Sequence, residues 1–176
     1  MAEKVQIELH TTIDDNGQME YNTIRTTGVY YAKPAYDVLT FKEKGEDGTV
    51  HNLLTIRPEK VSMKRTGLVE MTQQFRLQNI TENVFTHPYG NIHMETSTHD
   101  ISYQVDKNLT GKLQVNYAVK LNGQEERNQK MEISFTKLEN SKIPFQQCSN
   151  QYTTHISADS FITMNDTIPL SKSISI

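Results

Sequence analysis

The sequence predicts an all-β protein, an antiparallel up-and-down β-barrel of about eight to ten strands. Apolar and polar residues alternate almost without interruption from Val5 to Phe135, turn-forming residues divide this stretch, and no convincing helical period occurs. A flat sheet of this size would expose two unpaired edges and a bare apolar face, and closure into a barrel removes both. A β-sandwich is the alternative that the pattern leaves open.

Ten segments of strand length follow one another along the chain. Asn16-Gly17, Asp47-Gly48 and Asn122-Gly123 are dipeptides that suit tight hairpins. Gly28 lies within a long segment and predicts a bend or bulge there. Short connections favour sequential antiparallel pairing. The predicted segments are residues 5–9, 19–31, 39–43, 54–56, 61–65, 69–75, 92–96, 99–105, 113–121 and 127–135.

The charge and composition of the chain argue against several classes of function. The net charge of −3 argues against a nucleic-acid-binding surface, and no apolar run approaches the length of a membrane span. The single cysteine, Cys148, cannot form an intramolecular disulfide, and the N-terminal residues enter a strand pattern directly, so we expect a cytoplasmic protein. Neither nucleic acid nor membrane is expected as a partner, and the oligomeric state is left open.

The chain changes character near its C-terminus. Residues 1–136 form the predicted barrel domain, whereas residues 137–176 are rich in Ser, Thr, Asn and Gln and lose the alternation. We interpret residues 137–176 as a poorly ordered or loosely docked extension. An additional edge strand near residues 155–164 is the alternative.

Several short motifs carry a family resemblance. They are Gly28-Val29-Tyr30-Tyr31, Leu39-Thr40-Phe41-Lys42-Glu43, Val61-Ser62-Met63-Lys64-Arg65-Thr66-Gly67 and Thr86-His87-Pro88-Tyr89-Gly90. In this order and spacing they resemble the YwiB-like family of small bacterial proteins, over about residues 4 to 136. The resemblance implies a calycin-like barrel, the group that includes lipocalins and fatty-acid-binding proteins. It implies no activity, because the family has none assigned, and it does not extend to the C-terminal extension.

Four polar side chains are candidate ligand anchors inside the barrel. Arg65, Arg127, Tyr103 and Tyr117 all fall on inward-facing positions. A buried arginine needs an anionic partner, which a ligand carboxylate or phosphate could supply. The alternatives are that both arginines reach solvent at strand ends, or that Arg65 pairs internally with Glu43.

Methionines share the same inward positions. Met63, Met71 and Met94, together with Met131, could line an adaptable pocket, or they could simply fill the core. His99 is also expected to face inward and His93 outward, so the histidines should not converge on a metal.

Other chemistry has little support in the sequence. No nucleophile elbow, phosphate loop or zinc motif occurs, so neither catalysis nor a cofactor is expected. A basic stripe at Arg57, Lys60 and Lys64 lacks the interleaved aromatic residues of a nucleic-acid platform, and we interpret it as solvated surface.

These features lead to one functional hypothesis and one alternative. The hypothesis is a binding protein that holds a small, partly apolar ligand in the barrel, with an anionic group on the ligand as one option. The alternative is a non-catalytic interaction scaffold that acts through exposed turns or the C-terminal extension. A central cavity of about 300 Å³ or more would favour the ligand container over the scaffold.

Overall fold

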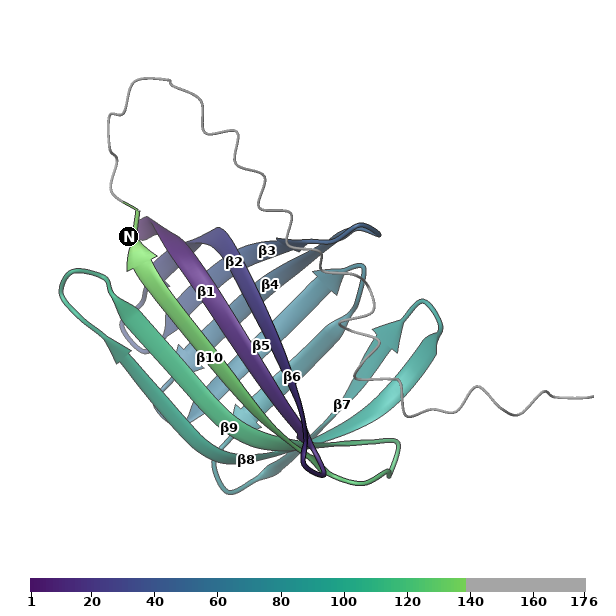
Figure 1. Ribbon diagram of the computed structural model, residues 1–176. Helices are drawn as coiled ribbons and strands as arrows, with labels where there is room; N and C mark the ends of the chain where they lie inside the picture. The colour runs from purple at the N-terminus through teal and green to yellow at the C-terminus, as the bar shows by residue number, and fades with distance from the viewer. Residues whose placement is uncertain (139–176) are drawn as a thin grey trace, which may run out of the picture.

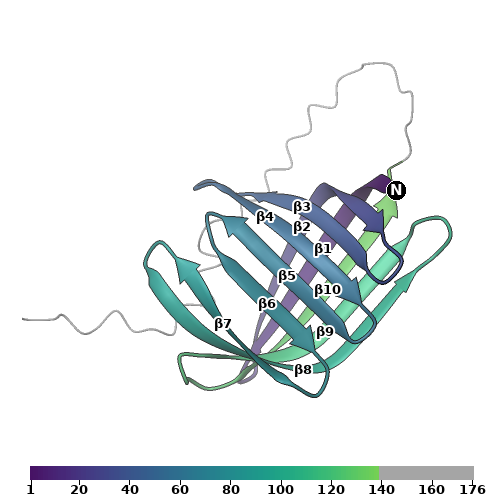
Figure 2. The ribbon, with the colours of Figure 1, turned by 180° about the vertical axis from the view of Figure 1, so that it is seen from behind.

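The computed structural model describes residues 1–138, which form one ten-stranded antiparallel sheet rolled into a nearly closed barrel (Figures 1 and 2). Neighbouring strands in the sheet follow the order β6-β5-β4-β3-β2-β1-β10-β9-β8-β7. The strands are β1 (Ala2–Asp15), β2 (Gln18–Ala32), β3 (Asp37–Lys44), β4 (Thr49–Arg57), β5 (Lys60–Gly67), β6 (Met71–Arg76), β7 (Ile80–His87), β8 (Gly90–Val105), β9 (Gly111–Leu121) and β10 (Arg127–Lys137).

The predicted all-β, up-and-down barrel is confirmed, but the prediction misplaced one hairpin. Strand β7 was missed, and the segments 92–96 and 99–105 are two halves of the single strand β8. Strand β7 gave only a weak inward apolar signal, because Ile80 and Val84 are exposed on its outer face, while Phe85 shares the inner face with the polar Thr81 and Asn83. The apolar residues of β7 are therefore divided between its two faces.

The inward position predicted for His99 is wrong. The pairing of β8 with β9 shifts register between Thr98 and Asp100, so His99 is the extra residue of a β-bulge, and it is exposed. A bulge moves every later side chain by one position relative to a simple alternation. This shift turns Ile101 toward the core, because the inward positions before the bulge are the even-numbered ones that end at Thr98.

The strands β2, β1, β10 and β9 form a continuous wall. Strand β1 pairs with β2 from Ala2 to Asp15 and with β10 from Val5 to Asp14. Alternate side chains point inward, and the wall contributes some of the most completely buried side chains of the core. Examples are Ile7, Leu9, Leu113, Ile133 and Phe135, each no more than 1% exposed.

Two glycines allow close packing rather than unusual turns. A Cβ on Gly111 would lie 2.1 Å from Cζ of Phe135, the residue opposite on β10. A Cβ on Gly28 would lie 2.3 Å from the carbonyl oxygen of Thr40. Gly28 pairs in register with both neighbouring strands, so the bulge predicted there is wrong, and what the position requires is the absence of a side chain.

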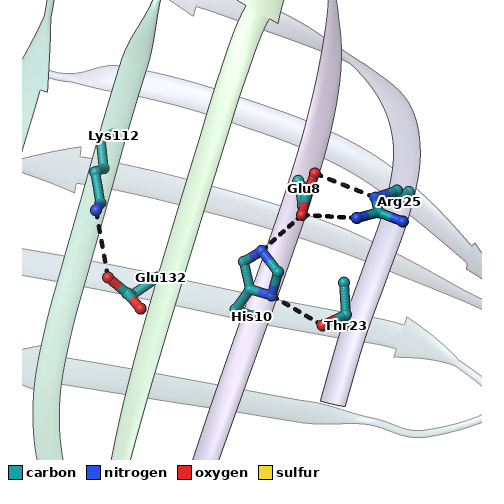
Figure 3. A network of polar contacts seen from close by, with 6 residues as sticks. All are labelled: Glu8, His10, Thr23, Arg25, Lys112 and Glu132. Carbon is teal, nitrogen blue, oxygen red and sulfur yellow. Dashed lines mark hydrogen bonds and ion pairs between the residues drawn. The ribbon is translucent and has the colours of Figure 1, made fainter. Parts of the chain in front are cut away.

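The outer face of the wall carries a polar network (Figure 3). Glu8 on β1 accepts hydrogen bonds from Nε and Nη2 of Arg25 on β2, each 3.2 Å long, and lies 2.7 Å from Nε2 of His10. Nδ1 of His10 is 2.8 Å from the Thr23 hydroxyl. The Arg25 hydrogen bonds lower the pKa of Glu8. Solvent screens such pairs, so the network adds little stability.

A shorter network lies on β9 and β10. Glu132 is held between Lys112 at 3.4 Å and Lys130 at 3.3 Å. Burial raises the pKa of Glu132, but hydrogen bonds from the two lysines outweigh it and the net shift is downward. Both networks mark this face of the wall as a solvated exterior, consistent with the predicted alternation.

The barrel closes at a seam between β6 and the β7–β8 hairpin, which leans away from β6 toward its tip (Figure 2). Isolated bridges replace a ladder here, at Glu70–Thr86 and Leu77–Thr98. Side chains supply further bonds: Nε2 of Gln73 donates to Oγ1 of Thr96 at 3.1 Å, and the Arg76 N–H donates to Oγ1 of Thr98 at 3.1 Å.

The C-terminal extension predicted from residue 137 lies almost entirely outside the described residues. Lys137 closes β10, and the Leu138 N–H donates to the Lys4 carbonyl at 2.9 Å. Within residues 1–138, no helix has the length and apolar character needed to cross a membrane.

Candidate ligand-binding site in the barrel

Three consecutive strands place a hydrogen-bonded polar group inside the barrel. Glu43 on β3, Asn52 on β4 and Arg65 on β5 occupy inward positions that apolar residues take elsewhere on these strands. Nδ2 of Asn52 donates to Oε1 of Glu43 at 2.7 Å, and Nε of Arg65 donates to Oδ1 of Asn52 at 3.1 Å. Nη2 of Arg65 lies 3.6 Å from Oε1 of Glu43.

This group is expensive to bury unless its charges are balanced. The Glu43 and Arg65 side chains are 1% and 13% exposed, respectively. Because each charge has the other as partner, the pair is close to neutral as a unit. The internal Glu43 partner that we considered as an alternative for Arg65 is therefore present.

A cavity of about 80 Å³ lies beside this group. Its lining includes Glu43 and Gln129, and each of these residues carries a buried oxygen, Oε2 and Oε1 respectively, that has no hydrogen-bond partner within residues 1–138. Buried oxygens of this kind normally accept a hydrogen bond. The volume is well below about 300 Å³, the lower end for small-molecule pockets, so the inner cavity alone does not favour the ligand container, and it holds only a few non-hydrogen atoms.

A second pocket, of about 350 Å³, adjoins the cavity at the seam. The two share Arg65 and Met71 in their linings. Nδ2 of Asn83, a buried donor without a partner in the described chain, belongs to a residue that lines the outer pocket. Cavity and outer pocket together therefore border every unpartnered buried side-chain atom found in residues 1–138.

Most of the predicted anchor residues line the inner cavity. Arg65, Tyr117 and the three methionines Met63, Met71 and Met94 all do so. Burial raises the pKa of Tyr117 to about 12, and the charge of Arg65 offsets part of that rise, so the phenol stays neutral. The ligand-binding role of these residues remains a prediction.

The other two predicted anchors lie elsewhere. Nη2 of Arg127 is 3.3 Å from Oδ2 of Asp15, and the Tyr103 hydroxyl donates to Oδ2 of Asp37 at 2.7 Å. Burial, followed by the hydrogen bond to Asp37, raises the pKa of Tyr103. Neither residue lines the cavity. The shared axis that we expected for Arg65, Tyr103 and Tyr117 thus brings together only Arg65 and Tyr117.

Sequence reasoning missed four amides that matter at this site: Asn52, Gln73, Asn83 and Gln129. Asn52 and Gln73 occupy inward positions between apolar residues, and Gln129 occupies one between Arg127 and Met131; such a polar interruption was the available signal. The fourth, Asn83, lies on the strand that the prediction missed.

No group of three or more metal-ligating side chains occurs within residues 1–138. His93, expected to face outward, is exposed and lies 3.5 Å from a Glu82 carboxylate oxygen.

Comparisons with known proteins place this barrel in a family. A model described as "Domain of unknown function (DUF1934)" matches residues 7–133. The chain belongs to the DUF1934 family. The uncharacterized β-barrel protein YwiB of Bacillus subtilis (strain 168) is 28% identical over 137 residues, which are 77% of this chain and 96% of that protein. The YwiB-like resemblance is thereby confirmed.

A solved member of the DUF1934 family supports the same fold. The crystal structure of the ywiB protein from Bacillus subtilis matches with a TM-score of 0.71 and 25% sequence identity, covering 78% of this chain and 94% of that one. The barrel is thus shared with an experimentally determined structure. The family description states no activity.

Proposed function

We propose that this protein is a non-catalytic binding barrel for a small, uncharged, partly apolar molecule. The ligand carries hydrogen-bond donors at its inner end and an acceptor at its outer end. The observation that carries this proposal is the placement of the three unpartnered buried atoms, all of which belong to residues that line two adjoining pockets: Glu43, Gln129 and Asn83.

The chemistry of the pockets sets the chemistry of the ligand. Two oxygens in the cavity, on Glu43 and Gln129, call for donors. Arg65 already balances Glu43, so an additional charge of either sign would be buried without a partner. A neutral amide or alcohol group meets both demands. The anionic ligand considered from the sequence is disfavoured, because Arg65 and Arg127 both have carboxylate partners.

The seam supplies a route for the ligand. Arg65 and Met71 separate the outer pocket from the cavity, beside the place where β6 and β7 are joined by an isolated bridge. Methionine has a flexible side chain that can move aside at low cost. The outer pocket, with Met71 and Val84 in its lining, accommodates the apolar body of the ligand.

The test uses the full chain and a panel of small neutral amides and diols that carry an apolar end, such as propionamide, methylurea and 1,2-propanediol, in ligand-observed NMR. A ligand of five non-hydrogen atoms gains at most about 7 kcal/mol, so micromolar to millimolar affinity is expected. The variant Gln129→Met should abolish binding of the amides. It should fold as stably as the parent protein or more stably, by up to about 1 kcal/mol, because an unpaired oxygen is removed.

Gln114→Met is the matched control, since Gln114 lies on the outer face of β9, and it should leave binding unchanged. Failure of the whole panel to bind, or equal binding by the Gln129→Met variant, would contradict the proposal. The interaction-scaffold alternative remains a prediction, because most of the extension that it invokes lies beyond residue 138.

A further inference from the structure

A groove of about 1140 Å³ runs along the outside of the barrel where β2 and β3 separate. These two strands pair only from Gly28 to Ala32 on β2 and from Asp37 to Phe41 on β3. Beyond this ladder, β2 continues paired with β1, and β3 continues paired with β4. The facing edges of the two strands therefore border the groove.

The groove concentrates positive charge in a protein whose net charge is −3. Its lining includes four lysines that have no ion pair within residues 1–138, together with the exposed ring of His51. Arg25 also lines the groove but is already paired with Glu8. The acidic member of the lining, Glu43, is buried and paired with Arg65. The four lysines are Lys4, Lys42, Lys44 and Lys64.

Strand pairing holds these cations together rather than leaving them scattered. Lys42 lies opposite His51 in the β3–β4 ladder, and Lys64 lies opposite Leu53 in the β4–β5 ladder. Like charges on neighbouring positions destabilise a sheet slightly unless an anion neutralises them. Leu53, 41% exposed, provides an apolar contact between them.

We propose that this groove binds an extended, acidic segment of a partner protein. Charge complementarity favours an acidic partner. The groove lies between two strand edges, where an extended segment can add main-chain hydrogen bonds. The Thr26 hydroxyl donates to the Lys42 carbonyl at 3.0 Å, so the two strands are still bridged at this point, and the open main-chain edge is that of β2 from residue 18 to residue 25.

The aromatic residues in the groove favour a protein partner over a nucleic-acid partner. Single-stranded nucleic acid binds by stacking its bases on accessible aromatic side chains. Phe41 is the phenylalanine of the groove lining, and it is buried at 4% exposure. The tyrosines Tyr21 and Tyr89 are well exposed but lie outside the lining. A nucleic-acid strand would find charge here but, apart from the His51 imidazole, no stacking surface.

The experiment measures binding of a fluorescein-labelled peptide of alternating aspartate and valine to the full chain by fluorescence anisotropy. The double variant Lys42→Glu/Lys64→Glu should weaken binding by about tenfold or more. The matched control is Lys60→Glu/Lys107→Glu, which makes the same change in net charge; Lys60 lies on the same strand as Lys64 but outside the groove. The control should bind the peptide as the unmodified protein does.

Chemical-shift mapping on the unmodified, ¹⁵N-labelled protein supplies a second readout that does not depend on the folding of a variant. Perturbed amides should cluster on β2, β3 and β4 next to the groove. Absence of peptide binding, an equal loss in both double variants, perturbations elsewhere on the barrel, or tighter binding of a single-stranded DNA of equal charge would each overturn the proposal. Because the probe and the variants differ from those used for the inner cavity, the two proposals fail independently.

Discussion

The wall of β2, β1, β10 and β9 and the seam between β6 and β7 close the same barrel by different means. The wall is a continuous ladder whose interior surface is mostly apolar, with the buried Gln129 of β10 as an exception. The seam relies on isolated bridges and on the hydroxyls of Thr96 and Thr98, and its strand β7 carries Asn83, whose buried Nδ2 has no partner within residues 1–138. Stability is thus concentrated in one half of the barrel, and the capacity to admit a ligand in the other.

The largest effect on stability is expected from removing a large buried side chain from the wall. Phe135 is 1% exposed and stacks on Tyr30 with ring centroids 5.2 Å apart. Phe135→Ala should therefore lower the free energy of unfolding by about 3–5 kcal/mol, measured by urea denaturation. Gly111→Ala should be much less damaging in the Phe135→Ala background than in the parent protein, because the ring that would clash with the new methyl group is gone. Additive effects of the two substitutions would contradict this account of the wall.

The next largest effect on stability is expected at the buried pair of Glu43 and Arg65. Arg65→Met leaves the Glu43 carboxylate buried without its cation, and should cost about 3 kcal/mol of unfolding free energy. The double variant Glu43→Met/Arg65→Met should recover part of this loss, because apolar groups replace both charges, although the buried Asn52 amide loses both of its partners. A double variant that is less stable than Arg65→Met would show that the ion pair adds net stability to the fold, rather than only offsetting the cost of burying its two charges.

The seam should open to solvent more readily than the wall. Thr98→Val removes the acceptor for the Arg76 N–H and should cost about 1 kcal/mol. Hydrogen exchange monitored by NMR should show faster exchange at the Glu70 and Thr86 amides than at the Ile7 amide in the parent protein, and Thr98→Val should widen the difference. Equal protection of seam and wall would remove the distinction between them.

The smallest effect belongs to the outer face of the wall. Arg25 lowers the pKa of Glu8 in the folded protein, so this carboxylate stabilises the fold above its unfolded pKa. That contribution is lost as the pH falls through the folded-state pKa of Glu8, which lies below the ordinary value for a glutamate. Thermal melts of the parent protein and Glu8→Gln should therefore differ near neutral pH and converge in acid. A difference that grows in acid would contradict the sign.

The sequence was sufficient to predict the strands of the wall but not those of the seam, and the reason is physical. Alternation reports burial on one face, and residues such as Leu113 and Ile133 obey it strictly. Strand β7 exposes Ile80 and Val84 and turns Asn83 inward, so its pattern opposes its placement. The bulge at His99 similarly depends on pairing between distant segments, which no local pattern encodes.

The candidate site was predictable in part. Arg65, Tyr117 and the methionines were found because an inward position needs only the alternation and a known strand. Arg127 and Tyr103 share that property, yet they pair with Asp15 and Asp37, partners set by the curvature of the closed barrel. The unpartnered oxygens of Glu43 and Gln129 become visible only when all hydrogen bonds can be counted.

The most direct test is a high-resolution crystal structure of the full chain soaked with the tightest-binding neutral amide of the panel. Continuous density for the amide should lie within hydrogen-bond distance of Oε2 of Glu43 and Oε1 of Gln129, and should be missing from Gln129→Met crystals treated in the same way. Separate water molecules on both oxygens, with the amide nowhere in the cavity, would contradict the account.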